Sequence, residues 1–538
     1  MADQEQTPSN PIATVPRFSE GKVRALETSV PLSHSVIWRL QHDYYVQRGL
    51  KAWTEDMVPS YITNNPLIAE IYAGIMAGFL EDCMGPARRD EKVLSPECPL
   101  RIVELGAGTG KFSFLLLRKL TALLRARRIS AETLRYCMAD CSEALIAEWQ
   151  ANPSLKTFVE DGVLEFKQLQ IGAEAAAIPA HWDCAPLVII ANYFFDSLPQ
   201  DAFMISNGQI SESMVTTSAA AEGTSLSGLQ LSFNTVPALP DRYAEKSWNA
   251  ILEEYRTRLT AATVYFPTAA LALLQRFSSL SDGRMLVLAA DKGFTHIEDL
   301  ELLQGPPTVE FHAGSHCFSQ VVNFEAISRY YAGKGGEALL PQKHISSLNI
   351  CAFLERSGED GFPITRKAYR EVVDGFGPDD LFTLMGWLDA HLHEVSAAQA
   401  LAILRLTRWD PTALMRLFPV VAPQLRTLVA ERLDLRDAVF SVMANHFPVS
   451  RGDNELAFDC GVILLELRFF AEAMEMFTIS EQALGPSAAT SYNLGLCSAG
   501  LGRSEEALAF MVKACDQDPA FAPAQSARAR LEGERKPG

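Results

Sequence analysis

The stretch LRIVELGAGTGKFSFLLLRKL, residues 100–120, decides the fold. Its first six residues are mostly apolar and predict a short buried strand. GAGTG predicts a glycine turn, and the apolar residues that follow recur at helical spacing. A strand, a glycine turn and a helix in this order are typical of an α/β domain that binds a ligand at the end of a strand.

Further apolar segments predict a sheet around this unit. They cover residues 134–140, 164–171, 186–192 and 284–291, and helical patterns separate several of them. Strands that are apolar throughout indicate a parallel sheet covered on both faces. We therefore expect a Rossmann-like α/β domain over 100–357, with an insertion at 203–283 before its fifth strand. The insertion should contain a hairpin at Asn207-Gly208 and two helices, and could form one wall of the acceptor pocket.

The residues before this domain predict a disordered arm at 1–20 and a helical segment at 21–99. The arm is polar and rich in proline, and it lacks the pattern of a signal or transit peptide. In the helical segment, four aromatic residues could form a lid over a ligand, although such residues are more often core: Tyr44, Tyr45, Trp53 and Tyr61.

The residues after the domain predict helices alone, as a helical region at 358–450 and a repeat region at 451–538. EAMEMF at 472–477 matches EALAFM at 506–511, which gives a period of 506 − 472 = 34 residues. This period, with small residues at equivalent positions, is typical of tetratricopeptide (TPR) repeats. A generic helical bundle is the alternative. We expect this all-α region to dock a protein or peptide partner.

Composition limits the function further. The chain has 538 residues and a formal net charge of −18, which argues against nucleic acid as a partner. No apolar run is long enough to span a bilayer, so no membrane partner is expected. The ten cysteines contain no CxxC pair, which suggests free thiols in a reducing, cytoplasmic location.

The glycine turn resembles the S-adenosyl-L-methionine (SAM) loop of class I methyltransferases. Its pattern is G-x-G-x-G after an acidic residue, and Asp140 ends the next predicted strand, where a carboxylate can bind both ribose hydroxyls. We expect SAM to contact Glu104, Gly106, Ala107, Gly108, Gly110, Asp140 and Asn192. A nucleotide-binding or degenerate Rossmann-like domain without methyl transfer is the alternative.

A second polar cluster follows the fourth strand, in ANYFFDSLPQDAF at 191–203. Asn192 could hydrogen-bond an amine, Phe195 could flank the methyl acceptor, and Asp196 could orient a cationic nitrogen or take its proton. We predict these three as catalytic residues. The alternative is that Asp196 or Ser197 caps a helix and that the phenylalanines are core.

NYFFDSLP at 192–199 resembles the N-E-F-F-D-A-L-P stretch of the MidA-like SAM-dependent methyltransferases. VPSYITNN at 58–65, VLAADKGF at 287–294 and FSQVVNFEAI at 318–327 are similar to other segments of that family, in the same order. The resemblance covers about residues 40–355. It implies a class I fold, SAM as cofactor and, from the mitochondrial member, methylation of a protein arginine, with Asn192, Phe195, Asp196 and Pro199 on the acceptor side.

Two departures from the family bear on the acceptor. Tyr193 stands where the family has a Glu, which puts arginine specificity in doubt, and GAGTG replaces the usual G-P-G-R-G turn. His312 and His316, with Cys317, could suggest a metal, but structural zinc needs four ligands, so we expect none.

Together these observations predict a SAM-dependent methyltransferase. The acceptor should be a protein side chain, arginine or another nitrogen, and a nitrogen or oxygen atom would attack the methyl group by direct displacement. The alternative is a catalytically inactive SAM-binding or TPR scaffold protein.

Overall fold

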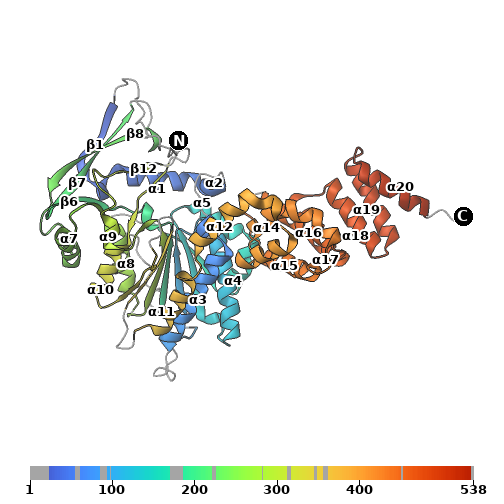
Figure 1. Cartoon of the computed structure of the whole chain (residues 1–538), viewed down its shortest axis with the longest axis horizontal. Helices are drawn as coiled ribbons and strands as arrows, with labels where there is room; N and C mark the ends of the chain where they lie inside the picture. The colour runs from blue at the N-terminus through green and yellow to red at the C-terminus, as the bar shows by residue number, and fades with distance from the viewer. Residues whose placement is uncertain are drawn as a thin grey trace, which may run out of the picture.

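The computed structural model describes residues 23–54, 61–84, 94–96, 98–169, 186–220, 226–281, 283–311, 317–343, 348–355, 361–449 and 452–534. Figure 1 shows a mixed α/β body at one end of the long axis, from which helices lead away to the C-terminus. The disordered arm predicted at 1–20 lies outside the described residues.

A seven-stranded sheet forms the centre of the body, with the order β15-β16-β10-β5-β2-β3-β4. The strands β10, β5, β2, β3 and β4 are parallel, and β16 is antiparallel to both of its neighbours. Their bounds are β2 Leu100–Leu105, β3 Leu134–Asp140, β4 Leu164–Gln168, β5 Leu187–Asn192, β10 Met285–Asp291, β15 Glu337–Leu339 and β16 Asn349–Leu354. The five predicted strands are therefore present, which confirms the Rossmann-like class. The predictions did not include β15 and β16.

Helices cover both faces of this sheet, as its uniformly apolar strands require. One face packs against α3 (Pro66–Met84), α4 (Lys111–Ala126) and α11 (Pro363–Val373). The other packs against α7 (Lys246–Arg258), α8 (Thr268–Ser278) and α10 (Phe324–Gly333). Along β2, Ile102 belongs to the first core and Val103 to the second, so alternate side chains serve opposite faces.

A second, antiparallel sheet adjoins the body, with the order β1-β7-β6-β9 and β8 paired to β7. Its strands are β1 Val23–Pro31, β6 Asp201–Ser206, β7 Gln209–Ala220, β8 Leu229–Pro237 and β9 Ala261–Phe266. The hairpin predicted at Asn207-Gly208 joins β6 to β7. The expected helical segment at 21–99 instead begins with β1, because β7, far along the chain, supplies the pairing groups of that strand.

The other regular elements described in the N-terminal segment are helices, and they have two roles. The helices α1 (Val36–Arg48) and α2 (Lys51–Thr54) lie above the carboxyl edge of the central sheet, where α1 lines a cavity. By contrast, α3 lies between α4 and α11 and is apolar around most of its circumference. Such a helix has to be buried, so α3 is part of the core and not of a lid.

Short elements complete the body. They are α5 Glu143–Ala151, α6 Pro153–Glu160, α9 Ile297–Leu300, β11 Gly293–Phe294 paired with β14 Val322–Asn323, and β12 Glu310–Phe311 paired with β13 Phe318–Ser319.

The C-terminal part is helical throughout its described residues, as predicted. Its helices are α12 Pro378–His391, α13 Ala397–Leu406, α14 Pro411–Val421, α15 Arg432–Ala444, α16 Leu456–Glu466, α17 Phe470–Leu484, α18 Ala488–Gly500, α19 Ser504–Gln517 and α20 Ala522–Glu534. The hydrophobic core of α3 and α4 continues without a break through α14 and α16 to Cys497 on α18. The helical tail is therefore packed onto the α/β body rather than tethered to it.

The internal repeat has a matching geometry. A Cβ atom on Gly461 would lie 2.7 Å from the Phe477 ring, and one on Gly495 would lie 2.7 Å from Met511 Cε. Both glycines thus allow a close helix contact, and both pairs are separated by 16 residues (477 − 461 and 511 − 495). The assignment of these helices to the TPR class, and their docking role, remain predictions.

The described residues also bear on the predictions about membrane spans and cysteines. No helix there combines the length and the apolar character that a bilayer crossing needs. The cysteines described in the structure are all free thiols, most of them buried.

Candidate active site

A cavity of about 690 Å³ opens at the carboxyl edge of the central sheet. Leu105 of β2 is paired with Ala139 of β3 on one side and with Ala191 of β5 on the other. The residues that follow these three, Gly106, Asp140 and Asn192, therefore lie side by side, and all three line the cavity. The chain leaves β2 toward β3 in one direction and returns as β5 in the other, so this is the topological switch point at which α/β sheets bind ligands.

The glycine turn forms the floor of the cavity. Gly106 and Gly108 have φ values of 66° and 54°, which residues with a side chain rarely adopt. A Cβ on Gly106 would approach Phe194 to 2.9 Å, and one on Gly108 would meet Trp53 at 3.4 Å. The turn is fixed from below, because the Gly106 N–H donates to the Ala139 carbonyl at 2.9 Å.

Glu104 lines the cavity immediately before the turn. Its Oε2 atom accepts hydrogen bonds from the Ser113 hydroxyl and, at 2.7 Å, from the Tyr136 hydroxyl. Burial raises the pKa of Glu104 to about 7, partly offset by these two hydrogen bonds. The carboxyl group is thus held in one orientation beside the floor, where a cationic ligand group would favour its ionised form.

Asp140 ends β3, with 8% of its surface exposed. Its Oδ1 atom accepts from the Ser142 backbone N–H at 3.1 Å. Burial raises the pKa of Asp140, whereas backbone hydrogen bonds from Ser142 and Gly108 lower it. The carboxylate lines the cavity, and its role toward a ribose remains a prediction.

Asn192 ends β5 and also lines the cavity. Its Oδ1 atom accepts from the Tyr72 hydroxyl at 2.6 Å, whereas its buried Nδ2 atom has no hydrogen-bond partner. The next residue, Tyr193, has a φ of 47°, an unusual value for a residue with a side chain. Such backbone strain at the end of a buried strand is typical of a binding or catalytic site.

The remaining residues of the predicted acceptor segment divide into two groups. Phe194 and Pro199 line the cavity, whereas Phe195 and Asp196 are buried and do not belong to its lining. The Asp196 backbone N–H donates to Asp291 Oδ2 at 3.2 Å, and the Ser197 hydroxyl donates to Asp196 Oδ1 at 2.9 Å.

Burial raises the pKa of Asp196 to about 6 and also raises that of Asp291, which the charge of Asp196 raises further. The two acids thus form a buried pair behind the acceptor segment. The catalytic roles of Phe195 and Asp196 remain predictions, and the geometry favours indirect ones.

The N-terminal segment closes the cavity from above. Two of the four predicted lid aromatics, Tyr45 and Trp53, line it and stack with ring centroids 5.9 Å apart. Tyr44 packs in a separate core, and the Tyr61 hydroxyl instead donates to Asp410 in the helical tail at 2.5 Å.

The sequence prediction missed most of this upper wall. Its lining residues are Ser33, His34, Ser35, Trp38, Arg39, Gln41, His42, Thr63 and Asn64. The only sequence signal was the similarity of 58–65 to the family segment before the cofactor domain, which includes Thr63 and Asn64.

His312 and His316 lie outside the described residues, so the structure gives no position for either. Among the residues that are described, no three His, Cys, Asp or Glu side chains are grouped closely enough to hold a metal ion.

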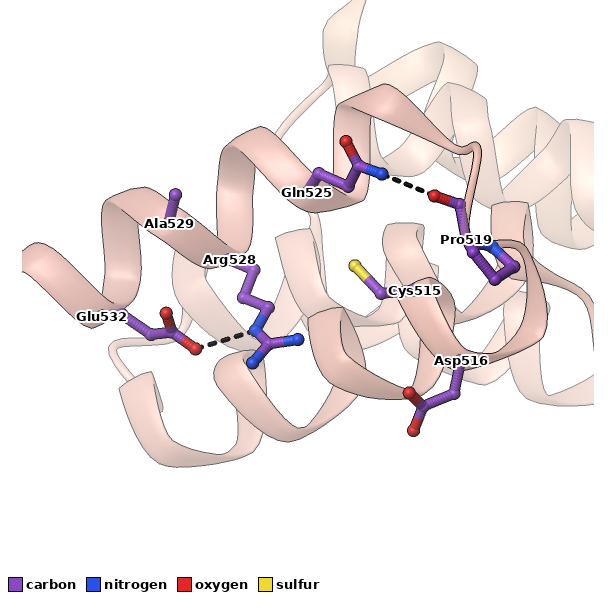
Figure 2. A pocket seen from close by; sticks show the side chains of 7 residues that line it. All are labelled: Cys515, Asp516, Pro519, Gln525, Arg528, Ala529 and Glu532. Atoms are coloured by element: carbon purple, nitrogen blue, oxygen red, sulfur yellow. Dashed lines mark hydrogen bonds and ion pairs between the residues drawn. The ribbon is translucent and has the colours of Figure 1, made fainter.

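A second pocket, of about 550 Å³, lies between α19 and α20 at the far end of the helical tail (Figure 2). There the Arg528 guanidinium pairs with Glu532 at 2.7 Å, and Gln525 Nε2 donates to the Pro519 carbonyl at 2.5 Å. Because these polar groups bind one another, and because the glycine turn is remote in the fold, this pocket is not the candidate site.

The cavity at the glycine turn fits SAM on three observations. The turn leaves space that a Cβ atom would fill, two carboxylates flank it, and the buried Oδ1 atom of Asn64 has no hydrogen-bond partner. An unpartnered acceptor oxygen and Glu104 could bind an ammonium group, and Asp140 could bind hydroxyl groups.

Comparison with known proteins gives the same assignment. Residues 91–305 match a family described as "Putative S-adenosyl-L-methionine-dependent methyltransferase". No curated protein matches the chain.

Solved structures with some similarity include two from Burkholderia thailandensis. One is an uncharacterized superfamily protein, with 16% identity, a TM-score of 0.40, and coverage of 62% of this chain and 90% of that chain. The other, a "likely methyl transferase" of the same superfamily bound to S-adenosyl-homocysteine, has 16% identity, a TM-score of 0.41 and the same coverage.

Proposed function

We propose that this chain, a SAM-dependent methyltransferase by the family that residues 91–305 match, methylates a side chain of a protein partner. One observation carries the methyltransferase part of the proposal. The glycine turn, Asp140 and Asn192 lie side by side at the switch point of the sheet and line one cavity. SAM supplies an electrophilic methyl group on its sulfonium when it is bound there.

The residues of the chain orient the reactants and exclude water. Glu104 and Asn64 would hold the ammonium group of SAM, and Asp140 its ribose hydroxyls. Phe194 packs over Gly106 and lies between the floor and the acceptor side. Trp53 and Tyr45 cover the opening and would exclude water from the bound reactants. Displacement is then favoured, because the reactants are held in position and no solvent shell has to be reorganised.

The protein character of the acceptor rests on the helical tail. Its repeat, with equivalent close contacts at Gly461 and Gly495, supports a docking surface for a protein or peptide. The family resemblance suggests a nitrogen acceptor, arginine in its mitochondrial member. Tyr193 in place of the family's Glu weakens the case for arginine, and an oxygen acceptor is equally compatible with direct displacement.

Methyl transfer from tritiated SAM tests this function. The full-length protein is incubated with tritiated SAM and a clarified cell extract, and acid-precipitable label is counted. We expect label in protein that is lost when Asp140 is replaced with Ala. Cofactor binding in calorimetry without any transfer would instead support the inactive SAM-binding scaffold.

A further inference from the structure

Gln41 on α1 lines the cavity and has a hydrogen-bond donor without a partner. The side chain is 2% exposed and lines the cavity, and its Oε1 atom accepts from the Phe318 backbone N–H at 3.2 Å. A backbone N–H can pair only with an acceptor, so the amide orientation is fixed. The Nε2 atom is left buried without a partner.

Asn192, on β5, is oriented in the same way. Tyr72 is fully buried, so its hydroxyl hydrogen needs an acceptor, and Asn192 Oδ1 lies 2.6 Å away. The Asn192 Nδ2 atom is therefore the group without a partner. Its Oδ1 atom already accepts one hydrogen bond, from Tyr72. Two lining residues from different elements thus each keep a buried N–H donor without a partner.

Charged side chains divide between the two halves of the cavity. Among the described lining residues, the only carboxylates are Glu104 and Asp140, which flank the glycine turn. The N-terminal wall contributes only basic side chains, His34, Arg39 and His42. His42 lies 3.5 Å from Asp43, whereas Arg39 has no ion-pair partner in the described part of the chain.

We propose that the methyl acceptor is a carboxylate, bound by Gln41 Nε2 and Asn192 Nδ2 and attracted by Arg39. This inference rests on the proposed methyltransferase function and specifies its substrate class. A carboxylate supplies acceptor oxygens for both of these donors, whose burial without a partner is unfavourable. A guanidinium or ammonium group carries only donors and would face donors and positive charge.

The reaction balances without a base. A lone pair of the carboxylate oxygen forms the bond to the methyl carbon while the carbon–sulfur bond breaks, and the electron pair remains on sulfur. The negative carboxylate and the positive sulfonium give a neutral methyl ester and a neutral thioether. No proton leaves the acceptor, which agrees with the position of Asp196 outside the cavity lining.

The chemical stability of the transferred label tests the proposal. Protein labelled from tritiated SAM is treated with mild base, which hydrolyses methyl esters to volatile methanol and leaves N-methyl groups in place. We expect most of the label to become volatile. Label that survives base and elutes with methylarginine or methyllysine after acid hydrolysis would overturn the carboxylate assignment while leaving the methyltransferase function intact.

A binding experiment decides the question even if the extract lacks the natural acceptor. N-acetylglutamate and N-acetylarginine are titrated into the complex of the full-length protein with S-adenosyl-homocysteine. We expect N-acetylglutamate to bind at least tenfold more tightly. If it fails to bind while S-adenosyl-homocysteine binds normally, the carboxylate assignment is wrong and the cofactor site stands.

Matched variants assign the effect to the donor wall. Gln41→Glu keeps an oxygen for the Phe318 N–H but replaces the free donor with an acceptor, so the affinity for N-acetylglutamate should fall at least tenfold. Gln47→Glu is the same change on the same helix at an exposed position outside the cavity, and should have no effect. Equal affinities in the Gln41→Glu variant and the wild type would overturn the proposal.

Discussion

Trp149 on α5 donates a hydrogen bond from its indole Nε1 atom to the carbonyl oxygen of Gly108 at 2.9 Å. The same side chain lies 3.4 Å from the position that a Cβ atom on Gly110 would take. Trp149 is 2% exposed, so its position is fixed by packing. One buried indole thus holds the glycine turn in the left-handed conformation that shapes the floor of the cavity.

The variant Trp149→Phe should weaken cofactor binding. It keeps an aromatic ring but leaves the Gly108 carbonyl without its donor, so the turn should lose its fixed shape. We expect the dissociation constant of S-adenosyl-homocysteine, measured by calorimetry, to rise about fivefold, which corresponds to about 1 kcal/mol. Trp387→Phe is the control, because Trp387 is 58% exposed on α12. Equal effects of the two changes would contradict this role.

Glu104 should make the fold less stable as the pH rises from about 4.5 to about 7. Its pKa is about 7 in the folded protein and about 4.5 when exposed, so within this window the folded state binds more protons than the unfolded state. The stability that the neutral carboxyl group contributes is fully present below about pH 4.5 and is lost as the pH rises, with a loss of roughly 3 kcal/mol by pH 7.

Glu104→Gln should remove this dependence. Urea unfolding at pH 5 and at pH 7.5 should show that the variant gains stability relative to the wild type at the higher pH. A constant difference between the two proteins would show that Glu104 titrates normally.

The variant Asp196→Asn should separate a positioning role from a base in contact with the acceptor. Asp196 lies behind the cavity beside Asp291, so we expect the affinity for S-adenosyl-homocysteine to stay within about twofold and kcat to fall less than about tenfold. A general base commonly contributes 10²–10⁴-fold. A loss of that size, measured in the labelling assay, would assign Asp196 to the chemistry itself.

The link between the helical tail and the cavity can be tested at Tyr61. Its hydroxyl donates to Asp410, a fully buried residue that caps α14. Tyr61→Phe should lower the free energy of unfolding by about 2 kcal/mol, as for hydrogen bonds to charged groups. Thr63 and Asn64 line the cavity, so the affinity for S-adenosyl-homocysteine should fall too.

Tyr492→Phe is the control for this change, because the Tyr492 ring is packed on Phe521 and its hydroxyl has no hydrogen bond within the described chain. If Tyr61→Phe destabilises the fold no more than this control, the tail is not coupled to the cavity through Tyr61.

Local patterns in the sequence predicted the central part of the fold. The strand and glycine turn at 100–110 and the strand that ends at Asp140 can be recognised from consecutive residues, because apolar runs and glycines act locally. The strand β1 could not, because its partner β7 lies about 190 residues away.

The candidate site was predictable to the same extent. Gly106, Asp140 and Asn192 follow recognisable strands, so their meeting at one edge follows from parallel pairing. Gln41 was missed because its free donor exists only when Phe318, 277 residues later, occupies its oxygen. Asp196 was predicted to face the acceptor, but it is buried beside Asp291 and does not line the cavity. The contact with Asp291, 95 residues later in the chain, cannot be read from the local sequence.

The most direct test of the central claim is a calorimetric titration of the full-length protein with SAM and S-adenosyl-homocysteine, repeated with Asp140→Ala. We predict binding of both ligands at one site per chain and a loss of at least tenfold in affinity in the variant. Failure of the wild type to bind either ligand, or equal affinity in the variant, would contradict the assignment of this cavity to the cofactor.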